Sequence, residues 1–374
     1  MTGLDRLAEA GVSVWLDDLG RERLVSGDLA RLVAQGVRGV TTNPTIFAKA
    51  IGDGSLYASD LAAVAAARRT PDQAVFDLAI EDVRRACDVL ADVYETSGRV
   101  DGRVSLEVDP RLAHDTVATI DQARELWARV DRPNLMVKVP ATVAGLPAVT
   151  TLIGEGISIN VTLIFALERY EEVLDAWMAG LELAHEGGRD LSAIGSVASF
   201  FVSRVDTMVD PLLEDAAAGG DADALRWRGM AALANARLAY QRFRARMSTP
   251  PWQGLAAAGA RPQRPLWAST STKNPAYDPT MYVTGLVAPT TVNTLPAATL
   301  ATVLADAGLA SAAPPDTVTE AGPSADRVMA ALEQHGIDMA DVVAQLERDG
   351  VASFADSWTH LVGAVGDALE HVAP

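Results

Sequence analysis

Eight short apolar stretches, rich in β-branched residues, recur along the chain, and the segments between them carry apolar residues at helical spacing. The stretches occupy residues 12–18, 39–43, 104–109, 135–140, 157–165, 193–202, 265–270 and 291–296. A strand followed by a helix, repeated many times, is the pattern of a parallel sheet. Eight such units predict an α/β protein built as one closed (β/α)8 barrel.

A doubly wound open sheet is the alternative arrangement of alternating strands and helices. It would place a glycine-rich turn directly after an early strand, as in dinucleotide-binding folds. The only nearby candidate, GEGIS at 154–158, begins before a predicted strand instead of following one. The barrel is therefore the favoured prediction.

The segments outside the eight units predict additional helices. The interval 44–103 is long enough for several helices, and residues 300–374 contain further helical patterns after the last strand. Two stretches rich in Pro, Ala and Gly, 248–265 and 310–324, have the composition of loops. No linker is long or polar enough to require a second domain. We predict one barrel domain over 1–374, with 300–374 a helical extension packed on it.

The charge and cysteine content exclude several classes of protein. With 31 basic and 49 acidic residues, the formal net charge is -18, which disfavours binding to nucleic acid. The single cysteine, Cys87, lies in a helical pattern and cannot form an intrachain disulfide. We find no signal-peptide pattern and no apolar run near the ~20 residues that cross a bilayer. These features predict a cytoplasmic protein that does not contact membranes.

One lysine stands inside an apolar run. Lys138 lies in LMVKVP (135–140), which the pattern assigns to a buried strand. Burying an unpaired ammonium is so unfavourable that such a lysine needs a carboxylate partner or the neutral amine form. A neutral amine is a nucleophile, so Lys138 is a candidate for covalent chemistry. A purely structural ion pair with Glu107 or Asp17 is the alternative.

Polar residues stand at or near the carboxyl ends of seven predicted strands, where a (β/α)8 barrel builds its chemistry. They are Asp17, Asp18, Thr42, Asn43, Glu107, Asp109, Lys138, Asn160, Thr162, Ser199, Arg204, Ser269 and Lys273. Each has a structural alternative when taken singly, since Asp and Asn cap helices and exposed cations are often only solvated. Together, an amine among carboxylates and hydroxyls favours Schiff-base chemistry on a carbonyl compound.

The sequence gives little support for a metal or a bound cofactor. Its histidines show no pair at metal-ligand spacing, and none ends a predicted strand: His114, His185, His335, His360 and His371. The GxSxG and P-loop patterns are missing as well. We therefore expect neither a metal nor a cofactor.

Seven stretches, in order along the chain, resemble the transaldolase family. They are WLDD, GVTTNPT, SLEVDPRL, LMVKVPAT, GISINVTLIF, SFFVSRVD and STSTKNP, and the resemblance covers about residues 12–296. The length and the acidic C-terminal extension resemble the longer bacterial branch of that family. The resemblance implies Schiff-base transfer of a dihydroxyacetone unit from sedoheptulose 7-phosphate or fructose 6-phosphate. The acceptor would be glyceraldehyde 3-phosphate or erythrose 4-phosphate, in the non-oxidative pentose phosphate pathway.

The resemblance also implies catalytic roles. Lys138 would form the Schiff base with the ketose donor, and Asp17 would deprotonate the C4 hydroxyl to drive carbon–carbon cleavage. Glu107 would act through a water held with Thr162 while the imine forms. Asp18, directly beside the implied base, leaves the choice between the two aspartates open.

The substrate-binding roles follow from the same resemblance. Asn43 and Ser199 would hold the dihydroxyacetone unit, and Arg204 would bind the sugar phosphate. Lys273 stands where many family members have arginine. Lysine keeps the positive charge but cannot form the bidentate contact of a guanidinium.

Two positions bear on the choice between transfer and release. In the related fructose 6-phosphate aldolases the Glu107 position is typically glutamine and the Phe201 position tyrosine, so this chain has the transaldolase residues. A fructose 6-phosphate aldolase-like enzyme is one alternative, and a non-catalytic sugar-phosphate-binding barrel is another. The sequence leaves monomer and homodimer equally open.

Overall fold

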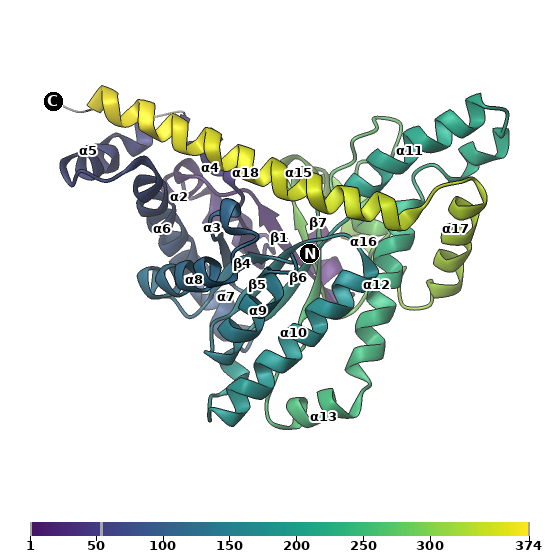
Figure 1. The fold of residues 1–374 in the computed structure, drawn as a ribbon, viewed down its shortest axis with the longest axis horizontal. Coiled ribbons are helices and arrows are strands. Elements are labelled where there is room, and N and C mark those ends of the chain that lie inside the picture. The colour runs from purple at the N-terminus through teal and green to yellow at the C-terminus, as the bar shows by residue number, and fades with distance from the viewer. Residues whose placement is uncertain (1, 53–54, 373–374) are drawn as a thin grey trace.

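Eight parallel strands close into one barrel in the computed structural model, which describes residues 2–52 and 55–372 (Figure 1). The strands are β1 (Val12–Asp17), β2 (Gly39–Thr41), β3 (Arg103–Glu107), β4 (Leu135–Pro140), β5 (Ile159–Ile164), β6 (Ser196–Phe201), β7 (Arg264–Ala268) and β8 (Thr291–Leu295). Each strand pairs with the next in sequence, and β8 pairs with β1. The predicted (β/α)8 barrel is confirmed, with a strand inside each of the eight predicted stretches to within one residue.

The first half of the chain supplies helices between and around strands β1 to β6. They are α1 (Gly3–Glu9), α2 (Arg21–Val25), α3 (Asp28–Ala34), α4 (Pro44–Gly52), α5 (Ala58–Ala66), α6 (Pro71–Val89), α7 (Ala91–Thr96), α8 (Thr116–Val130), α9 (Gly145–Gly154) and α10 (Leu167–Glu186). Three short 3-10 helices accompany them: η1 (Ser55–Tyr57), η2 (Pro110–Leu112) and η3 (Leu191–Ala193). The interval 44–103 therefore holds several helices, as predicted, and Cys87 lies buried on α6.

The second half continues the same pattern and ends in helices. They are α11 (Ser203–Ala218), η4 (Ala222–Trp227), α12 (Ala231–Met247), α13 (Pro250–Ala257), α14 (Met281–Thr284), α15 (Ala297–Ala305), α16 (Ala307–Ser311), α17 (Gly322–Gln334) and α18 (Met339–Val372). The prediction of a loop over 248–265 is wrong for α13. Pro250 occupies the first turn of that helix, where a missing N–H costs nothing.

The barrel wall is buried on both faces, as a parallel sheet requires. Every residue of β4, β5 and β6 is buried. Trp15, Trp177 and Trp267 are among the largest fully buried side chains. Because the strands are covered on both sides, a charged side chain in the wall needs hydrogen-bond or ion-pair partners within the protein.

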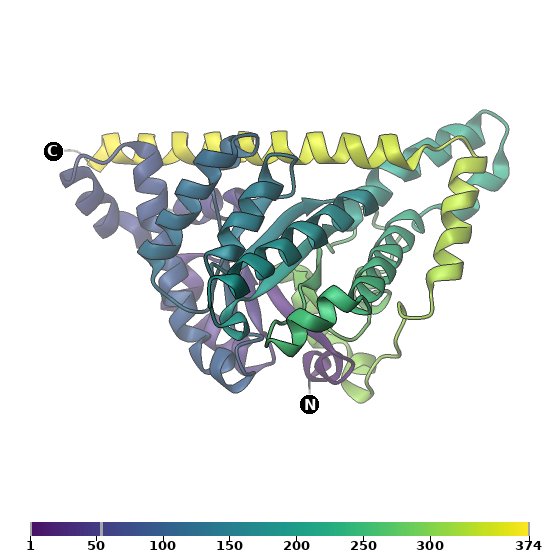
Figure 2. The same cartoon turned by 60° about the horizontal axis from the view of Figure 1, so that its bottom comes forward.

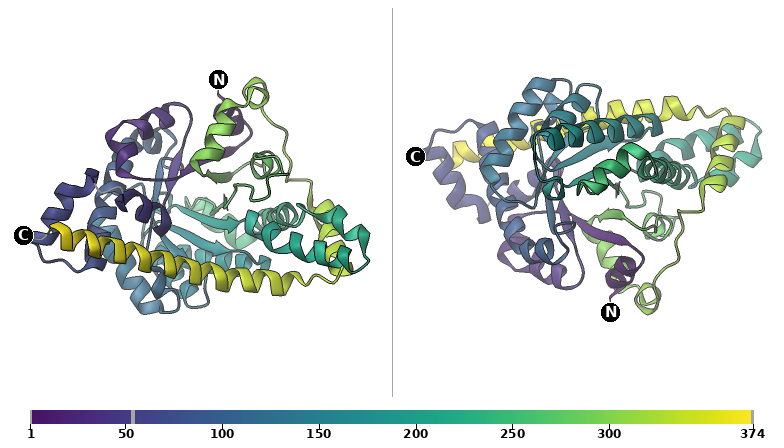
Figure 3. Two further views of the ribbon diagram at one scale, coloured as in Figure 1. Left: turned by 90° about the horizontal axis from the view of Figure 1, so that it is seen from above. Right: turned by 90° about the horizontal axis from the view of Figure 1, so that it is seen from below.

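The last helix, α18, packs along the outside of the molecule. It is 34 residues long and contacts α4, α5, α6 and α11. Figure 2 shows it as a straight rod along one edge, and Figure 3 shows it crossing most of the molecule's length. Phe354 of α18 meets Phe201 of β6 with ring centroids 6.4 Å apart, and Trp358 meets Phe76 of α6 at 4.9 Å. The described helices include none long and apolar enough to span a bilayer.

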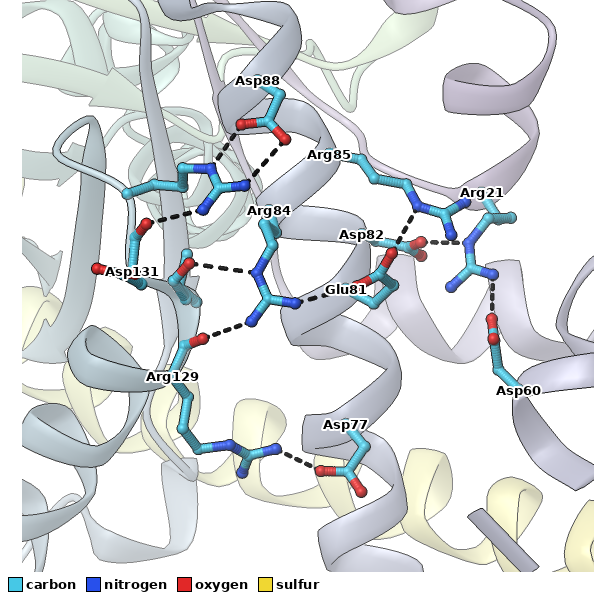
Figure 4. A network of polar contacts seen from close by, with 12 residues as sticks. Arg21, Asp60, Asp77, Glu81, Asp82, Arg84, Arg85, Asp88, Arg129 and Asp131 are labelled. Carbon is cyan, nitrogen blue, oxygen red and sulfur yellow. Dashed lines mark hydrogen bonds and ion pairs between the residues drawn. The ribbon is translucent and has the colours of Figure 1, made fainter. Parts of the chain in front are cut away.

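A buried cation fixes the segment that follows β1. The Arg21 guanidinium forms ion pairs with Asp82 of α6 and Asp60 of α5, as Figure 4 shows. The hydroxyl of Tyr57 donates to Asp82 at 2.6 Å and accepts the Arg21 backbone N–H at 3.1 Å. Side chains of Arg21 and Asp82 are 4% and 0% exposed, so each charge depends on the other.

Asp82→Ala should destabilise the fold strongly, because it leaves the buried Arg21 guanidinium without one of its two carboxylates. We expect a loss of about 3 to 5 kcal/mol in the free energy of unfolding, measured by urea denaturation. Asp88→Ala on the same helix removes a pair with Arg132 that is 55% and 31% exposed. That control should cost at most about 1 kcal/mol. Equal losses in the two variants would contradict the role of this network.

Candidate active site

Lys138 and Glu107 stand side by side in the barrel wall. The register of β3 and β4 pairs these two residues directly. Lys138 Nζ lies 2.8 Å from Glu107 Oε1, and the two residues are 5% and 4% exposed. The carboxylate therefore removes the electrostatic cost of burying the ammonium. The same contact provides an acceptor for a proton leaving the amine.

The chain after β2 completes the surroundings of this pair. Lys138 Nζ donates to the backbone carbonyl of Thr42 at 2.8 Å. The Thr42 hydroxyl donates to Glu107 Oε2 at 2.7 Å and lies 2.8 Å from the carbonyl of Ser105. Both carboxylate oxygens of Glu107 are thus hydrogen-bonded, which fixes the orientation of the acid beside the amine.

The two neighbouring aspartates at the end of β1 differ in their surroundings. Asp17 accepts a hydrogen bond from the Thr41 hydroxyl at 2.8 Å, and Thr41 also contacts Thr294 of β8 at 2.6 Å. Asp18 instead pairs with Arg23 at 2.7 Å. Burial raises the pKa of Asp17 above its ordinary value, while the Lys138 charge and the Thr41 hydrogen bond oppose that shift. Asp18 is thus paired with a cation, whereas Asp17 has the Thr41 hydroxyl as its hydrogen-bond donor.

Thr162 presents a buried hydroxyl next to the same pair. It is opposite Pro140 in the register of β4 and β5, two residues beyond Lys138. Its Oγ1 has no hydrogen-bond partner among the described residues. A small cavity of about 20 Å³ is lined by Glu107, Lys138, Thr162 and, from α18, Phe354. That volume is enough for about one water molecule.

A second polar chain links residues of β3, β5 and β6. Ser199 Oγ donates to Asn160 Oδ1 at 2.7 Å, and Asn160 Nδ2 donates to Ser105 Oγ at 3.0 Å. All three residues are fully buried. Asn43 accepts the Ile46 backbone N–H at 3.1 Å, so it caps α4. Asn43 also lines the large cavity at the carboxyl ends of the strands.

Two cations, Arg204 and Lys273, line the large cavity at the carboxyl ends of the strands. Arg204 lies in the first turn of α11, and Lys273 lies in the β7–α14 loop (residues 269–280). Partial burial lowers the pKa of both, and the Arg204 charge lowers that of Lys273 further. Lys273 Nζ donates to Ser271 Oγ at 2.7 Å, and neither cation has a carboxylate partner within the described chain. Like charges held close without a counterion favour binding of an anion.

Aromatic side chains surround Phe201, which lies next to Arg204. The Arg204 Cζ lies 5.2 Å from the centroid of the Phe201 ring. Phe201 also packs against Phe165 at 5.2 Å and against Phe354 of α18. Phe201 therefore links the Arg204 side of the site to α18.

One large cavity of about 1200 Å³, the mouth, opens at the carboxyl ends of the strands and connects these groups. Its lining includes eight of the nine predicted site residues: Asp17, Asn43, Lys138, Thr162, Ser199, Phe201, Arg204 and Lys273. Glu107, the ninth, lies behind Lys138 and lines the small cavity. The predicted residues are therefore brought together, although α11 and a loop, not strands, carry the two cations.

Several contacts of the site were missed from the sequence. Thr41 holds Asp17, and Asn160 holds Ser199. Their signal was present, since both are polar residues in buried strands. Phe354 gave no such signal, because it lies on an amphipathic helix more than fifty residues after the last strand.

Comparisons with known proteins agree with this geometry. A family model described as transaldolase/fructose-6-phosphate aldolase matches residues 14–365. A protein of Parafrankia sp. (strain EAN1pec) named transaldolase is 54% identical over 371 residues, covering 99% of each chain. A Thermobifida fusca protein of the same name is 55% identical, covering 98% of each chain. Transaldolase 1 of Streptomyces coelicolor is 54% identical, covering 98% of this chain and 95% of its own.

Asp17→Asn should stabilise the folded protein at neutral pH. The raised pKa means that folding disfavours the charged carboxylate, so the wild type loses stability as the pH rises through the folded-state pKa. The amide escapes that penalty. We expect a higher Tm for the variant than for the wild type at pH 7 to 8. This difference in Tm should narrow as the pH falls toward the ordinary aspartate pKa, where both states of the wild type become protonated. If the variant's stability relative to the wild type were lower at pH 8 than at pH 4, the raised pKa of Asp17 would be contradicted.

Proposed function

Because the chain belongs to the transaldolase/fructose-6-phosphate aldolase family, we propose that it is a transaldolase acting on phosphorylated sugars. It transfers a dihydroxyacetone unit from fructose 6-phosphate or sedoheptulose 7-phosphate to an aldose phosphate in the pentose phosphate pathway. The observation that carries the proposal is the buried Lys138 amine, 2.8 Å from Glu107 at the mouth of a closed barrel. We further propose that it works in the cytoplasm.

Formation of the Schiff base begins with Lys138. Its amine, after passing a proton toward Glu107, attacks the C2 carbonyl of the ketose and forms a carbinolamine. Glu107 then assists loss of water from that adduct, acting through a water molecule held with the Thr162 hydroxyl. The unpartnered Oγ1 of Thr162 and the adjoining cavity of about 20 Å³ support this role.

Cleavage of the donor requires a base at the C4 hydroxyl, and we assign it to Asp17. Asp17 takes the hydroxyl proton, the C3–C4 bond breaks, and its electrons pass to the iminium nitrogen, which leaves an enamine on Lys138. The shortened aldose departs. The raised pKa of Asp17 suits this step, because a more basic carboxylate accepts a proton more readily. Asn43 and Ser199 hold the hydroxyls of the three-carbon unit.

The cation pair binds the phosphate of donor and acceptor. Arg204 and Lys273 lack carboxylate partners in the described chain, and a phosphate between them would relieve their mutual repulsion. Lys138 and this pair line the same cavity, so the reacting carbon and the phosphate of one substrate can both be held there. The carbonyl of the acceptor then meets the enamine, and the carbon–carbon bond forms in reverse of the cleavage.

Trapping with borohydride should label Lys138. Incubation with fructose 6-phosphate forms the iminium, and reduction fixes it as a stable secondary amine that peptide mass spectrometry locates. The chain holds only three lysines, Lys49, Lys138 and Lys273, so the assignment has few alternatives. Lys138→Arg is the matched control and should give no adduct. A label on Lys273, or on Lys49, whose side chain is outside the described part, would contradict the mechanism.

Phe201→Tyr should convert part of the transfer activity into release of dihydroxyacetone. The wild-type ring offers no proton to the enamine, so the fragment waits for an aldehyde, whereas a tyrosine hydroxyl can protonate it. We expect dihydroxyacetone formation without acceptor to rise on the order of tenfold or more, as acid catalysis permits. The released dihydroxyacetone is measured through its enzymatic reduction, which is coupled to oxidation of NADH.

Phe165→Tyr, which changes a neighbouring ring instead, is the control for added polarity and should leak no more than wild type. If the unmodified enzyme releases dihydroxyacetone as fast without acceptor as it transfers with one, the aldolase alternative would replace this proposal.

A further inference from the structure

The β7–α14 loop carries Lys273 but makes little apolar contact with the helix beside it. A cavity of about 200 Å³ separates part of the loop from α11, and Lys273 and Asn274 line it. Packing alone therefore does not fix the position of Lys273. The loop also begins at Ser269, whose φ of 54° is left-handed and unfavourable for a residue with a side chain.

Hydrogen bonds tie this loop and the start of α14 to one face of α11. Ser203 N donates to the Ser269 carbonyl at 2.9 Å. The Tyr282 hydroxyl donates to Asp206 Oδ2 at 2.7 Å, and the Tyr277 hydroxyl donates to Asp210 Oδ2 at 2.6 Å. Positions 203, 206 and 210 follow the spacing of one helix face. The loop is thus held before and after Lys273 by the helix that bears Arg204.

The second oxygen of each acceptor carboxylate is held by a backbone N–H. Asp206 Oδ1 accepts the Ala232 backbone N–H at 2.8 Å, and Asp210 Oδ1 accepts that of Gly229 at 2.8 Å. Asp206 is 1% and Asp210 is 6% exposed. Gly229 has φ +69°, and a Cβ there would lie 2.9 Å from Cζ of Tyr277. The glycine therefore lets the tyrosine ring approach close enough to reach Asp210.

We propose that Tyr277 with Asp210, and Tyr282 with Asp206, are positioning pairs that hold Lys273 beside Arg204 for the substrate phosphate. The inference rests on the proposed transaldolase function and names a part of its phosphate site. Two cations repel one another before substrate arrives, so an untethered loop would let Lys273 move into solvent. The tethers keep the pair assembled, and the phosphate then binds without first ordering the loop.

Tyr277→Phe tests the proposal because it removes one hydroxyl and keeps the ring. We expect the KM for glyceraldehyde 3-phosphate to rise about fivefold, the change that one lost hydrogen bond typically makes in a binding constant. The KM for unphosphorylated glyceraldehyde and the kcat with each acceptor should stay within about twofold, since the reacting centre at Lys138 is untouched. Steady-state kinetics at saturating fructose 6-phosphate provide these values.

Four further variants separate the possible causes. Tyr240→Phe removes a tyrosine hydrogen bond of 3.0 Å to the Pro289 carbonyl, away from α11, and should leave both KM values unchanged. Asp210→Ala should raise the KM for the phosphorylated acceptor as Tyr277→Phe does. The variant that combines both substitutions should have the same KM as either single variant. Arg204→Ala should raise it more than any of them.

The outcomes distinguish this inference from the proposed function. If Arg204→Ala raises the KM for the phosphorylated acceptor and Tyr277→Phe does not, the positioning role is wrong while the phosphate site stands. Equal rises for both acceptors in Tyr277→Phe would also overturn it, because the loss would then be general. If Arg204→Ala has no selective effect, the phosphate site itself is misplaced. A missing borohydride adduct on Lys138 would instead overturn the transaldolase proposal.

Discussion

The pairing of Lys138 with Glu107 is the constraint around which the rest of the site is arranged. A parallel barrel has apolar side chains on both sides of its wall, so a buried charged group there needs hydrogen-bond or ion-pair partners within the protein. The register of β3 and β4 supplies such a partner directly. A shift of one residue between these strands would turn one of the two side chains toward the surrounding helices. The register of β3 and β4 that stabilises the fold therefore also places Glu107 beside Lys138 for the chemistry of the site.

The site combines groups that favour folding with groups that oppose it. Glu107 and Lys138 neutralise one another, whereas Asp17 is half-buried with only partial compensation of its charge, and Arg204 and Lys273 repel each other. Such strained electrostatics are typical of functional sites. The stabilising counterparts lie elsewhere, for instance in the Arg21 ion pairs that fasten the segment after β1 to α5 and α6. Ion pairs among the outer helices stabilise the fold, whereas the incompletely compensated charges at the mouth destabilise it.

Much of this arrangement could be predicted from the sequence, because its signals are local. Each strand is a short apolar run, and Lys138 stands out since its charge interrupts one. The contacts made by α18 could not be predicted, because an amphipathic helix shows which face is buried but not what it packs against. The same is true of Tyr277 and Asp210, which are 67 positions apart and meet only through the loop's path. Helix α13 was missed because its prolines, which usually mark loops, occupy its first turn.

The place of α18 in the chain has a consequence for biosynthesis. The strands and Lys138 precede it, so a growing polypeptide can close its barrel before the helix that lines one side of the mouth has been made. At roughly 5 to 20 residues per second, the 34 residues of α18 take on the order of 2 to 7 s to synthesise. During that interval the nascent barrel lacks Phe354, which lines both cavities beside Lys138. Completion of the last helix is thus the step that finishes the wall of the cavity in which the lysine lies.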